Sequence, residues 1–339
     1  MSTLPAASAD LPWMQPAQRA LAQAIDADRL GHAVLLHVPR GTGGEWLARW
    51  IAARLFCRAA NAPCGECVEC RRVAADQHPD CSFVQPLEDS KEIKVDQVRE
   101  LVAELALSSH GGARKLAILA PAERLNRNAA NSLLKTLEEP TRGTLIVLVA
   151  AEIARLPATV LSRCTRVAVP APGHEQALEW LRRHGAAGVD WPPVLAALGD
   201  RPFAALDADP VAVAAVAGDV RGTLDAATGG AGRLDPVATA DRWSRDGYGL
   251  RLDCIENWIT DRIRAAARGG AGVSKMRAAT HLPATGLALN IRALFEALDL
   301  VREARGLAES TVNKSLVLER LLWRLAAAPA ARVAGSIRE

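Results

Sequence analysis

Over the first 170 residues, short apolar runs alternate with stretches whose apolar residues recur every three or four positions. Runs at 33–38, 115–119 and 144–149 have the character of buried strands, and 82–85 and 166–169 are shorter candidates. The intervening patterns predict helices at 45–56, 95–105 and 128–139, the last closed by Pro140. Strands that alternate with helices predict an α/β fold with a mostly parallel sheet covered on both faces.

From residue 170 onward the pattern predicts helices only. Helical spacing recurs at 175–183, 243–268, 287–305 and 314–328, and breaks are expected around 191–193 and 199–202. In the last helix, leucines at 3.6-residue spacing favour the core of a helical bundle: Leu318, Leu321, Leu322 and Leu325. We therefore predict three domains: an α/β domain at 1–169, a small helical domain at 170–210 and an all-helical domain at 211–339.

The composition adds limits on location and partners. The 41 Lys+Arg and 38 Asp+Glu leave a net charge of +3, so any contact with nucleic acid has to be local. The longest uncharged apolar run, 143–151, falls short of the roughly 18 residues that a membrane span needs, and the N-terminus lacks the pattern of a signal peptide. We therefore expect a cytoplasmic chain with no membrane partner, in which disulfides are disfavoured.

Four of the seven cysteines lie within one short segment, 57–70, as C-x6-C-x2-C-x2-C: Cys57, Cys64, Cys67 and Cys70. Two residues between cysteines let one turn direct both sulfurs at the same point, which suits tetrahedral zinc. Four protein ligands leave no open position for a substrate, so the predicted zinc is structural. A set of free thiols, or a redox pair, is the alternative. The other three cysteines are isolated in the sequence, and we expect each to be a small buried packing residue: Cys81, Cys164 and Cys254.

A glycine-rich turn follows the first predicted strand, where a phosphate-binding loop would lie. A working loop ends in Lys followed by Ser or Thr, and these positions hold Gly44 and Glu45, after Gly41 and Gly43. The second buried strand should end in an acidic pair, and it is followed instead by Ala120 and Pro121. With the lysine, the hydroxyl and both carboxylates missing, we expect neither a nucleotide cofactor nor ATP hydrolysis on this chain.

Three stretches together resemble the clamp-loader branch of the AAA+ proteins. They are AANSLLKTLEEP at 129–140, LSRCTR at 161–166, and the cysteine cluster between the phosphate-loop helix and the next strand. The resemblance is strong over most of the first 170 residues and looser at 292–325. It implies a P-loop NTPase-like domain with a zinc-binding insertion, then a small helical lid domain and an all-α C-terminal collar domain.

The resemblance also implies a role for the SRC motif at Ser162, Arg163 and Cys164. Arg163 would be an arginine finger, projecting from a helix N-terminus into the ATP site of a neighbouring ATPase subunit. Backbone N–H groups at 162–166 could also face a phosphate at such a terminus. Lys135, Glu138 and Glu139 of the LEEP element are possible interface residues or solvated charges.

The implied function is that of a non-hydrolysing stator in DNA replication. Its partners would be gamma/tau-type ATPase subunits and a delta-type subunit in a hetero-pentameric ring, which loads the sliding clamp on primer–template DNA. The chain would then be a component of a polymerase holoenzyme, located at the nucleoid and replisome, and not an enzyme by itself. Two alternatives remain at this point: an active AAA+ ATPase motor subunit, and a zinc-dependent nucleic-acid-binding module.

Overall fold

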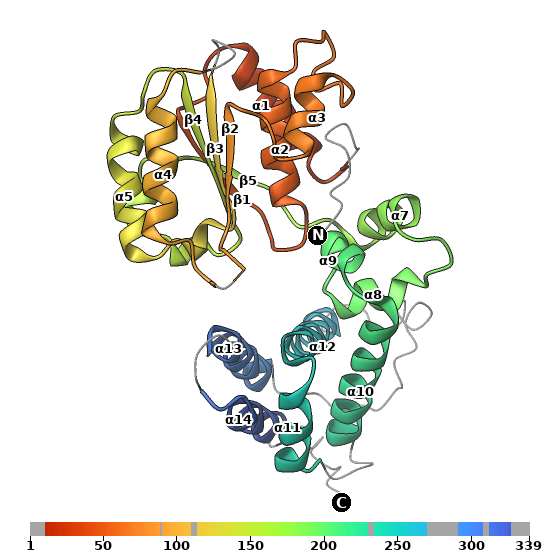
Figure 1. The fold of residues 1–339 in the computed structure, drawn as a ribbon. Helices are drawn as coiled ribbons and strands as arrows, with labels where there is room; N and C mark the ends of the chain where they lie inside the picture. The colour runs from red at the N-terminus through yellow and green to blue at the C-terminus, as the bar shows by residue number, and fades with distance from the viewer. Residues whose placement is uncertain are drawn as a thin grey trace, which may run out of the picture. The chain divides into compact units, whose positions relative to one another are not determined.

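The computed structural model of the chain describes residues 11–88, 90–109, 114–229, 234–269, 291–307 and 312–326. The chain folds into two compact units (Figure 1). The first comprises Met1–Gly188 and Asp200–Asp207, and the second comprises Val189–Gly199 and Ala208–Glu339. Residues 170–210 are thus shared between the two units, and the division into three domains at 169 and 210 stays a prediction.

The first unit is built on a five-stranded parallel sheet in the order β2-β3-β4-β1-β5. The strands are β1 (Ala33–His37), β2 (Cys81–Val84), β3 (Lys115–Leu119), β4 (Thr144–Ala150) and β5 (Thr165–Ala168). Every residue of β3 and β4 is buried, which explains why their sequences are uninterrupted apolar runs rather than alternating patterns. The predicted parallel α/β sheet is confirmed.

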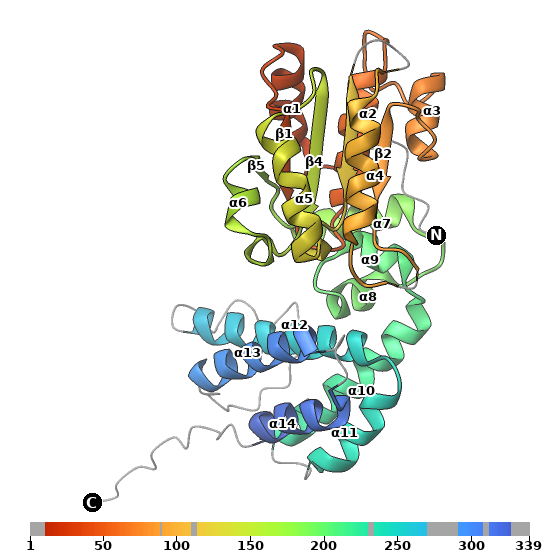
Figure 2. The same cartoon turned by 60° about the vertical axis from the view of Figure 1, so that its left-hand side comes forward.

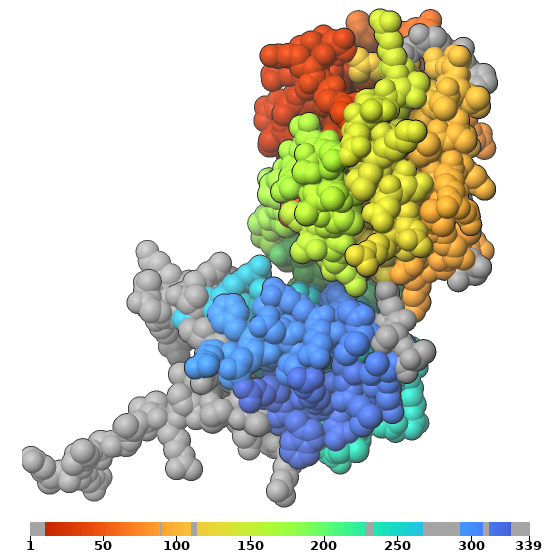
Figure 3. All heavy atoms as spheres, turned by 90° about the vertical axis from the view of Figure 1, so that its left-hand side faces the viewer, coloured from red at the N-terminus to blue at the C-terminus, as the bar shows by residue number. Residues whose placement is uncertain are grey.

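Helices cover both faces of this sheet. α4 (Val95–Ala106) and α5 (Arg127–Glu138) lie on one face, and α1 (Gln15–Asp26) and α2 (Gly44–Phe56) lie on the other (Figure 1). Figure 3 looks onto the first face, where α4 and α5 run side by side at the surface. Leu101, Leu133 and Leu137 of these helices pack on the strands and are almost fully buried. The carboxyl ends of the strands, where ligands bind in such folds, remain the natural place for a site.

Shorter elements complete the first unit. α3 (Val68–Ala74) lies in the cysteine-rich insertion, and the 3-10 turns η1 (Ala122–Arg124) and η2 (Ile153–Arg155) follow β3 and β4. The remaining helices are α6 (Ala158–Leu161), α7 (His174–His184) and α9 (Pro202–Asp207).

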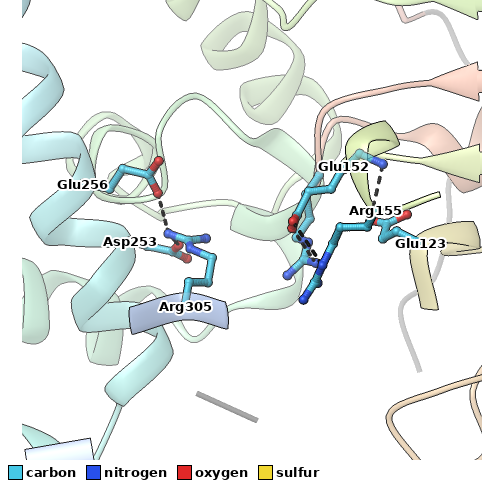
Figure 4. Close-up of polar contacts among 8 residues, drawn as sticks. Glu123, Glu152, Arg155, Asp253, Glu256 and Arg305 are labelled. Atoms are coloured by element: carbon cyan, nitrogen blue, oxygen red, sulfur yellow. Dashed lines mark hydrogen bonds and ion pairs between the residues drawn. The ribbon is translucent and has the colours of Figure 1, made fainter. Parts of the chain in front are cut away.

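The second unit contains helices only within its described residues, as the sequence predicts (Figure 2). They are α8 (Trp191–Ala197), α10 (Pro210–Gly229), α11 (Pro236–Arg245), α12 (Tyr248–Gly269), α13 (Ile291–Leu307) and α14 (Lys314–Ala326). The leucine stripe of α14 is buried, which confirms its assignment to a helical core. Arg305 of α13 pairs with Asp253 and Glu256 of α12, at 2.7 and 2.5 Å (Figure 4).

Two boundary predictions in this region are wrong. The helix predicted at 243–268 is interrupted, because Gly247 adopts φ +61° between α11 and α12. The expected break at 191–193 is instead the start of α8, since proline is tolerated in the first turn of a helix, where no backbone N–H partner is needed. Residues 287–290 and 327–328 of two predicted helices lie outside the described residues.

Among the helices of the described segments, none combines the length and the apolar content that a bilayer span requires.

Candidate functional site

The four clustered cysteines converge on one point. Cys57 follows the end of α2, Cys67 caps the N-terminus of α3, and Cys70 lies within α3. The sulfur of Cys57 lies 3.6 Å from that of Cys64 and 3.9 Å from that of Cys67, and the Cys64 and Cys70 sulfurs are 4.0 Å apart. A tetrahedron with metal–sulfur bonds of about 2.3 Å has edges of about 3.8 Å. The cluster therefore matches the size of a four-sulfur metal site, and it could hold a metal ion such as zinc.

Local backbone geometry favours thiolate at this cluster. The Cys67 N–H donates to the Cys64 sulfur and the Cys70 N–H donates to the Cys67 sulfur, both at 3.4 Å. Gly65 at φ +78° permits the tight turn between them. The backbone N–H groups of Cys67 and Glu66 lower the pKa of Cys64 to about 6, whereas burial raises the pKa of Cys70 to about 12. A bound cation would keep the buried sulfur deprotonated.

The insertion is fastened to the sheet by two buried side chains. Arg49 of α2 donates two hydrogen bonds to the Asp76 carboxylate, at 2.8 and 3.0 Å, and its guanidinium lies 4.0 Å from the centre of the Phe83 ring. His78 stacks on Phe56, with ring centres 3.8 Å apart. Burial lowers the pKa of His78, so it is neutral at pH 7. The position of the cysteines thus depends on contacts that no sequence motif identifies.

The glycine-rich turn has the predicted position between β1 and α2. Gly41 and Gly43 adopt φ +72° and φ +101°, and α2 begins at Gly44. The Thr42 backbone N–H and hydroxyl both donate to the Pro39 carbonyl, at 3.2 and 2.7 Å. The turn therefore has the glycine conformations that a tight loop needs, while the Thr42 backbone N–H and hydroxyl are used within the loop itself.

Aromatic side chains of the same unit pack against this turn. The Phe203 N–H donates to the Gly41 carbonyl at 3.0 Å, and the Trp13 indole donates to the Thr42 carbonyl at 2.9 Å. A Cβ at Gly43 would lie 2.6 Å from the Phe203 ring. Trp180 lies between the two aromatic residues, with ring centres 5.0 Å from Phe203 and 5.8 Å from Trp13. No sequence pattern predicts this packing, because the three aromatic residues come from distant segments of the chain.

Glu45 takes the place where a magnesium-binding hydroxyl is needed. Its carboxylate lies 3.8 Å from the Arg49 guanidinium. Burial raises the pKa of Glu45, and Arg49 opposes that shift. A carboxylate at this position repels phosphate, in contrast to the lysine and hydroxyl of a working loop.

The carboxyl ends of β3 and β4 carry a glutamate that the sequence reading missed. Glu123 of η1 is buried, and its Oε1 accepts a hydrogen bond from the Ala151 N–H at 3.4 Å (Figure 4). Within the part of the chain that the structure describes, its other carboxylate oxygen has no hydrogen-bond partner. Nearby, Glu152 lies 3.8 Å from Arg155 and 3.7 Å from Arg40. The available sequence signal was an acidic residue four positions beyond the end of an apolar strand.

Arg163 lies just beyond the C-terminus of α6, which ends at Leu161. The expectation that it projects from a helix N-terminus is wrong, and so is that of a phosphate facing such a terminus at 162–166, because β5 begins at Thr165. Arg163 Nη1 donates to the Thr159 carbonyl at 2.8 Å and to the Ser162 hydroxyl at 3.3 Å, and its Nη2 lies 2.5 Å from a Glu138 carboxylate oxygen.

Of the residues near Arg163 that the sequence singled out, one packs against the core and the others are exposed at the surface. Cys164 packs against the core beneath α5, and burial raises the pKa of its thiol to about 11. Lys135 and Glu139 of the LEEP element are exposed, as Glu138 is. One ion pair thus joins the LEEP and SRC segments in the structure. The two segments are far apart in the sequence, so the sequence alone does not predict this contact.

Comparison with known proteins relates residues 14–172 to one family. Residues 14–172 match the family described as DNA polymerase III, delta subunit. The chain is 47% identical over 154 residues to DNA polymerase III subunit delta' of Pseudomonas aeruginosa, and the aligned region covers 45% of this chain and 47% of the relative. It is 38% identical over 200 residues to the corresponding subunit of Haemophilus influenzae, covering 58% of this chain and 60% of the relative.

The chain therefore spans about half the length of the curated relatives it matches. Among solved structures, it is similar to a gamma subunit-related protein of Thermotoga maritima, with 16% identity and a TM-score of 0.43, covering 91% of this chain and 98% of that chain. This TM-score is too low to carry an argument. The sequence matches agree with one another: residues 14–172 match the family described as DNA polymerase III, delta subunit, and the chain is similar to delta' subunits of that polymerase.

Proposed function

We propose that this chain is a non-hydrolysing stator subunit of the clamp loader, and that Arg163 acts in trans as an arginine finger. The observation that carries the proposal is the contrast between two places in the first unit. The phosphate loop lacks its chemical groups and is packed against Trp13 and Phe203. Arg163, in contrast, presents a partly exposed guanidinium on the surface of the same unit.

An arginine suits the proposed task for a physical reason. Its guanidinium is planar and permanently charged, so it binds phosphate oxygens in a fixed geometry and stabilises the charge that develops during phosphoryl transfer. In other nucleotide hydrolases such a finger accelerates turnover by about 10³ to 10⁵. The nucleotide would belong to a neighbouring gamma/tau-type ATPase subunit.

We also propose that the four cysteines hold structural zinc. The donor set consists of four sulfurs at the spacing of a tetrahedron, which suits zinc better than a hard cation. When bound, the ion supplies a fixed point to which Cys57, Cys64, Cys67 and Cys70 tie the insertion.

The proposed partners are the gamma/tau-type ATPase subunits and a delta-type subunit in a hetero-pentameric ring. Through that ring the chain would help place the sliding clamp on primer–template DNA at the replisome. The net charge of +3 is consistent with a subunit that meets mainly other proteins and shares any DNA contact with them.

The test is the ATP turnover of the reconstituted complex with Arg163→Ala. We expect normal assembly and a loss of turnover at the one site that the finger serves. Arg166→Ala is the matched control, because Arg166 is also an exposed arginine of this segment and it lacks the pair with Glu138. Turnover that is the same in the wild-type and Arg163→Ala complexes would defeat the finger assignment.

A further inference from the structure

Glu138 is the first of the two glutamates that close the LEEP segment, and its carboxylate meets Arg163. The distance from Glu138 Oε1 to Arg163 Nη2 is 2.5 Å, which is a close ion pair. Among the described residues, no other carboxylate pairs with Arg163, and Glu139 is exposed without such a partner. One glutamate of the pair thus has a specific contact that its neighbour lacks.

The guanidinium is held from two different elements. Thr159 and Ser162, on the short helix α6 and its end, receive the two Nη1 hydrogens. Glu138, at the end of α5, forms an ion pair with Nη2. If all contacts came from one element, the side chain could move together with that element. Contacts from two elements restrain the orientation of the guanidinium plane.

The donor count leaves the arginine able to bind a phosphate. A guanidinium has five N–H donors. The hydrogen bonds to Thr159 and Ser162 both come from Nη1, and Nη2 is in the ion pair with Glu138. Within the described residues Nε makes no hydrogen bond, so the guanidinium keeps donor capacity for a phosphate oxygen. The arrangement thus restrains Arg163 and leaves its Nε–H available.

We propose that Glu138 is a positioning residue, which orients Arg163 before the nucleotide of a neighbouring subunit reaches it. The inference rests on the proposed function of Arg163. The exposed side-chain fractions of Arg163 and Glu138 are 34% and 50%, so the pair contributes little to folding. We expect the pair to act by orienting the Arg163 guanidinium. A small misplacement of a group that stabilises a transition state lowers the rate markedly.

The test compares reconstituted complexes that carry single substitutions at the LEEP element. The quantity measured is the Arg163-dependent turnover, which is the difference between the wild-type and Arg163→Ala complexes. We expect Glu138→Ala to lower its kcat by about fivefold, the upper range for one exposed ion pair, with unchanged KM for ATP and unchanged assembly. Glu138→Gln should restore most of the rate, because the amide oxygen can accept a hydrogen bond from the guanidinium.

Glu139→Ala is the matched control, since it removes the same charge one residue away without touching Arg163, and we expect wild-type turnover. Glu138→Ala added to Arg163→Ala should cause no further loss. Wild-type or faster turnover of Glu138→Ala would overturn the positioning role while leaving the finger intact. An equal loss in Glu139→Ala, or impaired assembly of Glu138→Ala, would overturn it as well. An Arg163→Ala complex with wild-type turnover would instead refute the proposed function itself.

Discussion

Asp219 organises the polar interior of the C-terminal unit. Its carboxylate accepts hydrogen bonds from Arg251 at 2.6 Å, from the Trp243 indole at 2.9 Å and from Arg242 at 3.2 Å, and thereby joins α10, α11 and α12. Burial alone would raise the pKa of Asp219, but these donors hold it below its usual range. A lowered carboxyl pKa means that the ionised form stabilises the fold, and that this stabilisation is lost as the pH falls through the lowered pKa.

Asp219→Asn therefore tests a single charge. At pH 7 we expect the variant to lose about 1–2 kcal/mol of local stability, because charge-assisted hydrogen bonds become neutral ones. The difference between the two proteins should shrink as the pH falls from the ordinary carboxyl pKa through the lowered one, because folded Asp219 is protonated only below its lowered pKa. Hydrogen exchange of α11 and α12, compared at each pH, measures this. A difference that stays constant down to pH 3 would show that charge is not the cause.

At the scale of single residues, the sequence predicted which residues carry functional groups better than it predicted which residues contact one another. Arg163 stood out because it belongs to a motif, whereas its partner Glu138 was only one of several surface charges until α5 and α6 were placed together. Glu123 was overlooked for the same reason, since its burial depends on the ends of two strands. Motifs constrain residue types, but tertiary packing decides which of them meet.

At the scale of elements, the apolar patterns predicted all five strands within about a residue of their ends. Buried parallel strands need continuous apolar runs, and this requirement leaves a strong local trace. The predictions were weaker where the effect of a glycine or proline depends on its place relative to a helix end. The turn at Gly247 and the start of α8 both depend on local geometry that residue type alone does not determine.

The cysteine insertion is the element whose stability we expect to depend on metal. Gently purified protein should contain about one equivalent of zinc, and chelation should expose the segment 57–80 to proteases while the sheet stays folded. Cys67→Ser should reproduce the effect of chelation. Cys81→Ser is the control, because Cys81 lies on β2 and its sulfur is not part of the cluster. Less than about half an equivalent of zinc would count against the site.

At the scale of the whole molecule, the family match rests on the first unit, where the cysteines, the LEEP segment and the SRC motif all lie. The isolated chain should show no ATP turnover above background, because the loop lacks the lysine, the hydroxyl and the acidic pair. Measured phosphate release tests this expectation. Hydrolysis that disappears on substitution of Gly44 or Glu45 would instead identify an active motor subunit.

The aromatic packing against the glycine-rich turn has one more consequence. Proteins that bind a nucleotide are stabilised in proportion to its concentration, since binding draws the folding equilibrium toward the native state. Here Trp13 and Phe203 make contacts at the loop that belong to the chain itself. Because these contacts need no nucleotide, we expect their contribution to the stability of the first unit to be the same at high and low ATP concentration.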